Sequence, residues 1–299
     1  MSEPAPLVPG QIPPWIRMRV REGESFKELK QLVQQRNLHT VCEEARCPNI
    51  FDCWSRRTAT FMILGDVCTR ACRFCAVTSG RPGELDIGEP LRVAESVAQL
   101  GLRHAVITSV DRDDLADGGA GIFARTIRAI RRRSPGTTVE VLTPDFQGDL
   151  EAARIVVDAG PDIFNHNTET VPRLYARIRP KAVYANSLAL LRHVKQLAPQ
   201  MVTKSGLMVG LGEDEDELLE VFRNMRAHDI DVLTVGQYLR PTKKHAEVAR
   251  YYRPEEFIRL KEKALAMGFG HVEAGPMVRS SYHADEQVPS EARKSLLAG

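Results

Sequence analysis

From Ala59 onward the chain alternates short apolar runs with helical patterns, and this alternation restricts its fold more than any other feature. Short apolar runs bounded by turn residues predict buried strands, and repeated strand and helix pairs are typical of a parallel sheet. Crossovers between parallel strands are almost always right-handed. We therefore expect an α/β fold in which six units curl into an open (β/α)6 partial barrel. The predicted strands cover residues 60–64, 105–109, 138–142, 163–165, 202–209 and 232–235.

Between these strands, apolar residues recur with the spacing of one helix face. Phe123, Ile127 and Ile130 form one such stripe, and Leu218 and Phe222 belong to another. Stripes of this kind are more often faces packed against a sheet than catalytic residues. In α/β barrels the functional loops follow the carboxyl ends of the strands, so the chemistry is expected there.

Three cysteines follow the first predicted strand, in the segment GDVCTRACRFCAV. Cys68, Cys72 and Cys75 have the spacing C-x3-C-x2-C. A disulfide is disfavoured because nothing else in the chain suggests export, and cytosolic thiols stay reduced. Structural zinc usually closes a shell of four ligands from paired Cys or His halves, and this triplet has no local fourth partner. An iron–sulfur cluster on three thiolates, with one iron free of protein ligands, fits best.

A second set of cysteines precedes the first, in the segment VCEEARCPNIFDCW. Cys42, Cys47 and Cys53 have the spacing C-x4-C-x5-C. All six cysteines of the chain belong to these two sets, which favours metal ligation over a distributed disulfide framework. Buried free cysteines, or one zinc shell built from both sets, are the alternatives. Two neighbouring triplets suggest two clusters, each one protein ligand short.

Charge and hydropathy argue against some partners. With 41 basic and 39 acidic side chains, the chain has no overall attraction for nucleic acid or an anionic membrane. It contains no run of about eighteen apolar residues, and its proline-rich start lacks the apolar region of a signal peptide. We therefore expect a cytoplasmic protein with no nucleic-acid or membrane partner, whose first 20 residues run extended.

The first cysteine set, with Phe74 just before its third cysteine, resembles the cluster loop of radical S-adenosylmethionine enzymes. With the second set, the chain resembles the lipoyl synthase family over nearly its whole length. The resemblance implies the same partial barrel and a sulfurtransferase of lipoate biosynthesis, which inserts sulfur at C6 and C8 of a protein-bound octanoyl chain. It also implies two [4Fe-4S] clusters. The first set would bind the cluster that uses S-adenosylmethionine to generate a radical, and the second an auxiliary cluster that is consumed as the sulfur source.

The resemblance also implies protein partners. These are octanoylated lipoyl-carrier domains, such as glycine cleavage H protein or a 2-oxoacid dehydrogenase E2, and an electron donor such as ferredoxin or flavodoxin. A basic loop at Lys243 and Lys244 would suit an acidic carrier, although such loops are usually only solvated. Another radical S-adenosylmethionine enzyme with an auxiliary cluster, or a non-enzymatic zinc or iron–sulfur module, is the alternative to this interpretation.

Polar side chains gather where the predicted strands end. The run from Thr108 to Gly121 is dense in acids and glycines, and its plainer interpretation is a solvated loop before a helix. Lys204 interrupts an apolar run, and a buried lysine is costly unless it pairs with an anion. By position and resemblance, the expected cofactor-binding residues are Phe74, Thr108, Asp111, Asn165, Glu169, Lys204, Ser205, Gln237, Tyr238 and Arg240.

Near the end of the chain, the run RSSY starts at Arg279 and resembles the end of the lipoyl synthase family, in which a serine completes the auxiliary cluster. An alkoxide is more labile than a thiolate, which suits a cluster that must lose an iron. We expect Ser280, in preference to Ser281, to be this ligand, and the tail must then fold back to the second set. The expected division is an N-terminal extension (1–57) carrying that set, the partial barrel (58–275) and a C-terminal tail (276–299).

Overall fold

A computed structural model describes residues 12–16, 24–36, 38–44, 47, 49–56, 58–282 and 284. The strands are β1 (His39–Thr40), β2 (Thr58–Ile63), β3 (Val67–Cys68), β4 (Thr78–Ser79), β5 (His104–Ser109), β6 (Thr138–Leu142), β7 (Ile163–Asn165), β8 (Val202–Val209), β9 (Val232–Gln237) and β10 (His271–Gly275). The α-helices are α1 (Glu24–Gln35), α2 (Val41–Glu44), α3 (Ile50–Ser55), α4 (Glu89–Gln99), α5 (Ala120–Arg133), α6 (Leu150–Val157), α7 (Tyr175–Ile178), α8 (Tyr184–Leu197), α9 (Glu215–Ala227) and α10 (Pro254–Ala266), and the 3-10 turns are η1 (Phe146–Gly148) and η2 (Pro172–Leu174).

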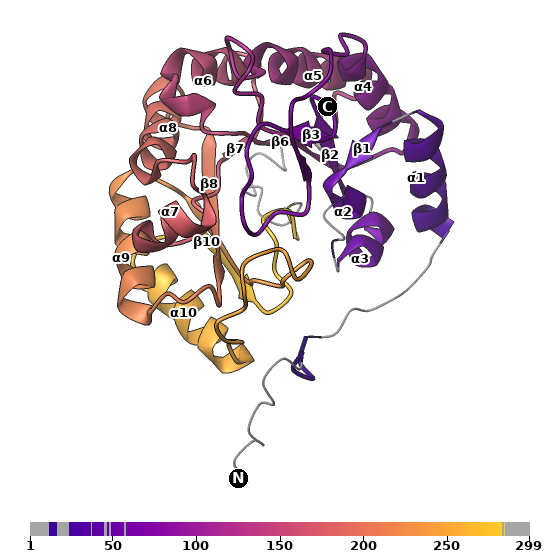
Figure 1. Ribbon diagram of the computed structural model, residues 1–299. Coiled ribbons are helices and arrows are strands. Elements are labelled where there is room, and N and C mark those ends of the chain that lie inside the picture. Colours follow the sequence, from indigo (N-terminus) through magenta and orange to yellow (C-terminus); the bar gives the residue numbers. More distant parts are fainter. Residues whose placement is uncertain are drawn as a thin grey trace.

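The main sheet has the strand order β1-β2-β5-β6-β7-β8-β9-β10, and it curves without closing (Figure 1). Every neighbouring pair is parallel except β1 and β2, which are antiparallel. The strands β3 and β4 form a separate parallel pair. The predicted α/β fold with an open partial barrel is therefore confirmed.

The six predicted strands correspond to β2 and β5 to β9, and two edge strands were not predicted. β1 is only two residues long, and four of the five residues of β10 are partly exposed. An edge strand is paired on one side only, so its residues need not be uniformly apolar. The apolar runs that predict buried central strands therefore gave no signal for these two edges.

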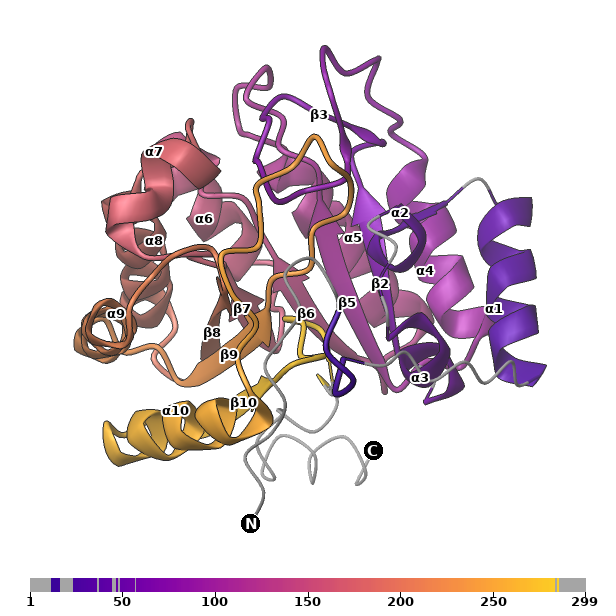
Figure 2. The same cartoon turned by 60° about the horizontal axis from the view of Figure 1, so that its bottom comes forward.

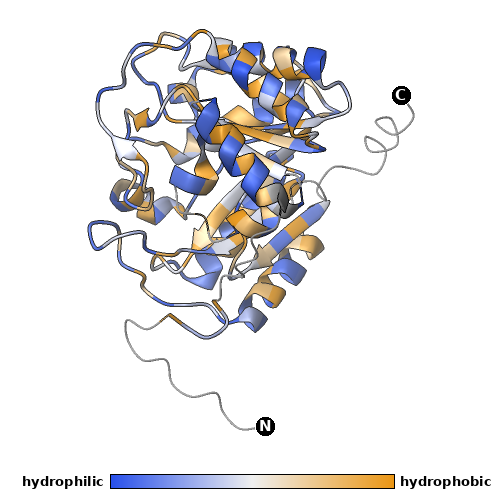
Figure 3. Ribbon diagram, turned by 90° about the vertical axis from the view of Figure 1, so that its right-hand side faces the viewer, coloured by the Kyte–Doolittle hydropathy of each residue, from blue (hydrophilic) through white to orange (hydrophobic). Residues whose placement is uncertain are grey.

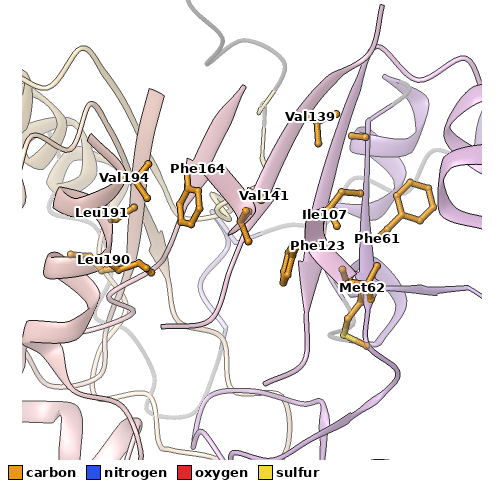
Figure 4. Packing of buried hydrophobic residues seen from close by; sticks show 14 of the residues in the cluster. Phe61, Met62, Ile107, Phe123, Val139, Val141, Phe164, Leu190, Leu191 and Val194 are labelled. Carbon is orange, nitrogen blue, oxygen red and sulfur yellow. The ribbon is translucent and has the colours of Figure 1, made fainter. Parts of the chain in front are cut away.

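The helices cover the outer face of the sheet, and α4, α5, α6, α8 and α9 follow one another around the arc (Figure 1). Their surfaces mix apolar and polar residues, as expected for half-buried helices (Figure 3). Figure 4 shows Phe123 of α5 beside the strand residues Ile107 and Val141, and Leu190 of α8 on the side of Phe164. All five side chains are buried in the hydrophobic core.

The opposite face of the sheet lines the barrel interior, and it carries the polar residues. Val139 and Val141 belong to the core packed against the helices. Because successive strand residues point to opposite faces, Glu140 between them points inward. The same alternation places Asn165 of β7 and Lys204 of β8 inside the barrel.

Some expectations lie outside the described residues, including most of the extended course of residues 1–20 and the end of the chain beyond residue 284. In the described ranges, no helix has both the length and the apolar composition needed to cross a bilayer. The division into three segments stays a prediction. β1, from the proposed N-terminal extension, pairs with β2 of the barrel.

Candidate functional site

The first cysteine set lies on the loop that leaves the carboxyl end of β2. At the start of this loop Leu64 has a φ of 71°, a conformation that is strained for a side chain of this size. The Leu64 N–H donates to the buried Glu89 carboxylate at 2.7 Å, and Arg112 donates to the Leu64 carbonyl at 3.3 Å. These contacts fix the direction in which the loop leaves the sheet.

Segments from distant parts of the chain hold this loop in place. The Arg73 N–H donates to the Ile178 carbonyl of α7 at 2.9 Å, and the Arg73 carbonyl accepts from the Ala246 N–H at 2.8 Å. Nε2 of His245 lies 2.9 Å from the Cys75 carbonyl, so it must donate to that oxygen. Figure 2 shows the loop after β9 rising beside the loop that carries β3.

The sulfur atom of Cys68 accepts hydrogen bonds from two backbone groups. The N–H groups of Arg70 and Asp111 lie 3.4 and 3.3 Å from Sγ. Desolvation, followed by the Asp111 carboxylate, raises the pKa of the Cys68 thiol to about 11. Desolvation also raises the pKa of Cys72 to about 12 and raises that of Cys75. Such thiols are protonated at neutral pH, so metal ligation would release their protons.

The buried Arg70 guanidinium links the cysteine loop to the ends of two strands. It lies 3.4 Å from Asp111 and 2.8 Å from Asp113, which follow β5, and 2.6 Å from Asp145, which follows β6. Although burial opposes ionisation, Arg70 lowers the pKa of Asp145. The sequence indicated Asp111 and the acid-rich run that contains Asp113, but it gave no signal for Arg70 or Asp145. Arg70 and Asp145 are 75 residues apart in the chain.

A buried ion pair crosses the barrel interior. Nζ of Lys204 lies 2.9 Å from Oε1 of Glu140, and both side chains are completely buried. The Asn165 amide donates to the same oxygen at 3.0 Å, and His104 Nε2 lies 3.5 Å from the other one. Although burial opposes ionisation, the nearby Lys204 ammonium holds the pKa of Glu140 at about 2. The anion that Lys204 requires is therefore Glu140, and cofactor contact by Lys204 stays a prediction.

A second polar group surrounds Glu169 beyond the end of β7. Glu169 has a φ of 66°, its N–H donates to the Gly206 carbonyl at 3.0 Å, and its carboxylate accepts from Asn167 at 3.1 Å. Desolvation raises the pKa of Glu169, and Arg179 partly offsets this effect. Arg179 is buried, and its charge also partly offsets the rise that desolvation causes in the pKa of Cys72. Arg179 was not predicted from the sequence.

Three other predicted cofactor residues lie in different surroundings. Thr108 donates to the Leu142 carbonyl at 2.9 Å, and Phe74 packs partly buried against the core. Ser205 is buried, and its hydroxyl has no partner in the described ranges. Because Lys204 points into the barrel, the adjacent Ser205 points towards the helices, so these two residues do not share one surface.

Gln237, Tyr238 and Arg240 hold the loop that follows β9. The Gln237 amide donates to and accepts from backbone groups further along this loop, at 3.1 and 2.8 Å. The Tyr238 hydroxyl donates to the Ala246 carbonyl at 2.8 Å, and Arg240 donates to the His245 carbonyl at 3.0 Å. These three side chains therefore support the segment that bonds to the first cysteine loop.

The second cysteine set lies on the short helices α2 and α3 and the segment between them. The Cys47 N–H donates to the Cys42 carbonyl at 3.0 Å. Desolvation, followed by Cys47, raises the pKa of Cys42 to about 12. Desolvation raises the pKa of Cys53, and both other cysteines add to this effect. The next residue, Trp54, is completely buried and lies 5.1 Å from the Phe26 ring of α1, so α1 supports this set.

The segment after β10 returns to the second set. The Asn49 amide donates to the Met277 carbonyl at 2.6 Å. Arg279 lies near enough to Cys47 to lower the pKa of its thiol against desolvation, and Tyr282 interacts with the third cysteine of the set. This is the return that ligation by Ser280 requires, and the ligation itself stays a prediction.

Both sets fit iron–sulfur clusters by their donor chemistry. Each set supplies three neighbouring sulfur atoms, and backbone N–H groups point at Sγ of Cys68. Thiolates and hydrogen bonds to sulfur are the features by which proteins hold such clusters. Within the part of the chain that the structure describes, no three His, Cys, Asp or Glu side chains converge on the position of a single metal ion.

Two family models match the chain. The model described as the radical SAM superfamily matches residues 62–225, and the model described as the N-terminal domain of lipoyl synthase matches residues 9–47. The fold is also similar to solved structures. Methylornithine synthase has a TM-score of 0.55 and 14% identity, with 91% of this chain and 92% of that chain covered. The FeFe-hydrogenase maturase HydG from Carboxydothermus hydrogenoformans has a TM-score of 0.55 and 14% identity, with 91% and 78% covered.

The superfamily match, the partial barrel and the three-cysteine loop at the end of β2 together define a radical S-adenosylmethionine enzyme. Lipoyl synthase of Rubrobacter xylanophilus is 61% identical over 284 residues, covering 95% of this chain and 88% of the relative. Lipoyl synthase of Bacillus subtilis is 57% identical over 283 residues, covering 94% and 95%. The chain belongs to the lipoyl synthase family. The predicted family, the sulfur-inserting activity and the use of S-adenosylmethionine with [4Fe-4S] clusters are confirmed.

Proposed function

We propose that the two cysteine sets divide the lipoyl synthase reaction between them. The first set would hold the cluster that works with S-adenosylmethionine, and the second would hold the cluster that supplies sulfur. This division rests on one observation, which is that different parts of the chain surround the two cysteine sets. A loop anchored by α7 and the segment after β9 carries the first set, whereas the N-terminal helices and the segment after β10 enclose the second.

Cys68, Cys72 and Cys75 would each bind one iron of the first cluster and leave the fourth iron open to S-adenosylmethionine. Together, the bound cluster and S-adenosylmethionine supply hydrogen abstraction from unactivated carbon, which no protein acid or base can perform. The chain contributes the position of the sulfur atoms. Arg70 ties the loop to two strand ends, and two N–H groups stabilise the Cys68 thiolate.

S-adenosylmethionine would bind in the polar interior next to the first set. Oδ1 of Asn165 and Oδ1 of Asn167 are buried without partners in the described ranges, and a ligand that carries N–H and O–H donors would satisfy both. The carboxylates of Asp111 and Glu169 would favour its positive charge. Phe74, Thr108, Lys204 and Ser205 remain predicted contacts, and Gln237, Tyr238 and Arg240 would act through the loop after β9.

The auxiliary cluster would be held by Cys42, Cys47, Cys53 and Ser280. Arg279 supports this assignment, because a guanidinium beside Cys47 favours the thiolate that metal ligation needs. The weaker serine ligand would allow the cluster to open on one side. Cys42 and Cys53, on their helices, would keep the remainder in place.

The substrate is an octanoyl chain on a lipoyl-carrier domain, and sulfur enters at C6 and C8. We infer glycine cleavage H protein or a 2-oxoacid dehydrogenase E2 as the carrier, and ferredoxin or flavodoxin as the electron donor. Lys243 and Lys244 are exposed and precede two residues that bond to the first cysteine loop. An acidic carrier docked there would lie beside this loop.

The test is the triple change of Cys42, Cys47 and Cys53 to alanine, with iron and products measured anaerobically on octanoyl carrier. The iron content should fall by half, from about eight to about four per chain. S-adenosylmethionine cleavage should continue, and sulfur transfer should be lost. Continued sulfur transfer, or loss of all iron, would contradict the proposed division.

A further inference from the structure

We propose that Asn49 and Gly236 are positioning residues that fix the segment 277–282 against the second cysteine set and so determine how firmly the serine ligand is held. This inference rests on the proposed function, because it takes a serine of this segment as the fourth ligand. Neither residue is a cysteine or a serine, and neither was predicted from the sequence. Each contacts the backbone just ahead of the RSSY run.

Asn49 joins the N-terminal cysteines to the C-terminal segment. Its carbonyl accepts from the Cys53 N–H at 3.0 Å, so it starts the helical turn that carries this cysteine. Its backbone N–H hydrogen-bonds to Cys47. Asn49 is only 6% exposed, and its side-chain amide donates to the Met277 carbonyl at 2.6 Å. One residue therefore touches two cysteines of the set and the returning segment.

The side chain of Asn49 is not used in the way its position favours. Asn49 is the N-cap residue of α3, where an asparagine normally accepts a hydrogen bond from the first turn and stabilises the helix by about 1 kcal/mol. No such bond is made, and the amide donates to Met277 instead. The side chain of this residue therefore bonds to the C-terminal segment and not to the start of its own helix.

Gly236 provides the second anchor. It lies in β9 directly opposite Gly275 of β10. A Cβ atom at Gly236 would overlap the carbonyl group of Val278, because the backbone of the segment passes against this strand. The Val278 carbonyl also accepts from Arg279 Nη1 at 2.6 Å. The Val278 N–H donates to the Gly275 carbonyl at 3.1 Å. A methyl group at Gly236 would push the segment away from the barrel.

The two anchors act on adjacent residues just before the proposed ligand. Asn49 hydrogen-bonds to Met277, and the absence of a side chain at Gly236 leaves room for Val278. Ser280 follows two residues after Val278. Only two or three positions separate these contacts from the serine, so we expect a shift at either one to displace it. One contact comes from the start of α3 and the other from β9, and loss of either one should loosen the serine while the three cysteines keep their places.

The experiment measures iron release from the auxiliary cluster to a chelator under anaerobic conditions. The parent is the full-length chain with Cys68, Cys72 and Cys75 changed to alanine, so that only the second set contributes. Asn49→Ala and Gly236→Ala should each release iron about five to ten times faster, as expected for loss of one buried contact. Gly136→Ala is the matched control, because a Cβ there meets only open space, and it should release iron at the parental rate.

A variant without either serine, Ser280→Ala with Ser281→Ala, distinguishes positioning of the serine ligand from a general loss of stability around the cluster. It should also release iron faster, and adding Asn49→Ala to it should have no further effect, because Asn49 acts through the serine. Parental rates for both Asn49→Ala and Gly236→Ala, or full additivity with the serine changes, would overturn the inference. An unchanged rate in the serine-free variant would instead overturn the serine ligand in the proposed function.

Discussion

The two cysteine sets are held in opposite ways. The first lies on one loop between Cys68 and Cys75. Arg70 of this loop pairs with carboxylates at two strand ends, and α7 and the segment after β9 bond to the loop backbone. The second lies on helices of four and six residues, and it is closed by a segment more than 200 residues later, through Asn49 and Met277. Under the proposed division, the first set is used again in each turnover and would benefit from many anchors. The second must release atoms and would benefit from a cover that can leave while the barrel stays folded.

The loss of Arg70 should separate the two cysteine sets most clearly. Changing Arg70 to alanine leaves Asp111, Asp113 and Asp145 together without their cation, and we expect a loss of about 3–5 kcal/mol in the free energy of unfolding. Urea denaturation of the cluster-free chain measures this loss. After reconstitution, iron should be lost from the first set and retained by the second.

Arg154→Ala is the matched control. Arg154 also lies between two carboxylates, those of Glu151 and Asp158, but this group is exposed. Exposed ion pairs contribute little, so the free energy of unfolding should hardly change. Equal losses in the two variants, or equal loss of iron from both sets in Arg70→Ala, would show that Arg70 does not anchor the first set in particular.

The sequence predicted the parts of the site that depend on local spacing. The cysteines of each set lie within a dozen residues of one another, and the strand 163–165 was predicted with its observed bounds. The contacts between distant residues were not predictable in this way. Arg70 meets Asp145 from 75 positions away, and Lys204 meets Glu140 from 64 positions away. The sequence indicated that Lys204 needs an anion, but only the order of strands in the sheet shows which one.

The next effect tests whether the polar interior stabilises the barrel independently of the cysteine sets. The folded-state pKa of Glu140 is about 2, below its ordinary value of 4.5. Ionised Glu140 therefore adds stability above about pH 4.5, and this contribution is lost as the pH falls towards 2. Between pH 5 and pH 3 the wild-type chain should lose about 2 kcal/mol more than Glu140→Gln.

Urea denaturation of the cluster-free chains at several pH values measures this difference. At neutral pH, Glu140→Gln should itself be less stable, because Lys204 is then buried without its anion. Parallel pH profiles for the two chains would show that folding does not lower the pKa of Glu140.

A weaker effect is expected for the loop after β9, which bonds to the first cysteine loop. Changing Lys243 and Lys244 to glutamate should raise the KM for octanoyl-carrier domain about two- to fivefold, because exposed charges contribute little each. The KM for a short octanoyl-lysine peptide should not change, since a peptide has no acidic domain to dock. Steady-state assays with both substrates test this, and unchanged kinetics with the carrier would reject docking on this loop.

Under the proposed division, only the first cysteine set should respond to S-adenosylmethionine. Two full-length variants are compared by electron paramagnetic resonance after reduction, one lacking Cys42, Cys47 and Cys53 and the other lacking Cys68, Cys72 and Cys75. S-adenosylmethionine should change the spectrum of the variant that retains Cys68, Cys72 and Cys75 and leave that of the other unchanged. A response in the variant that retains only the second set would contradict the proposed division.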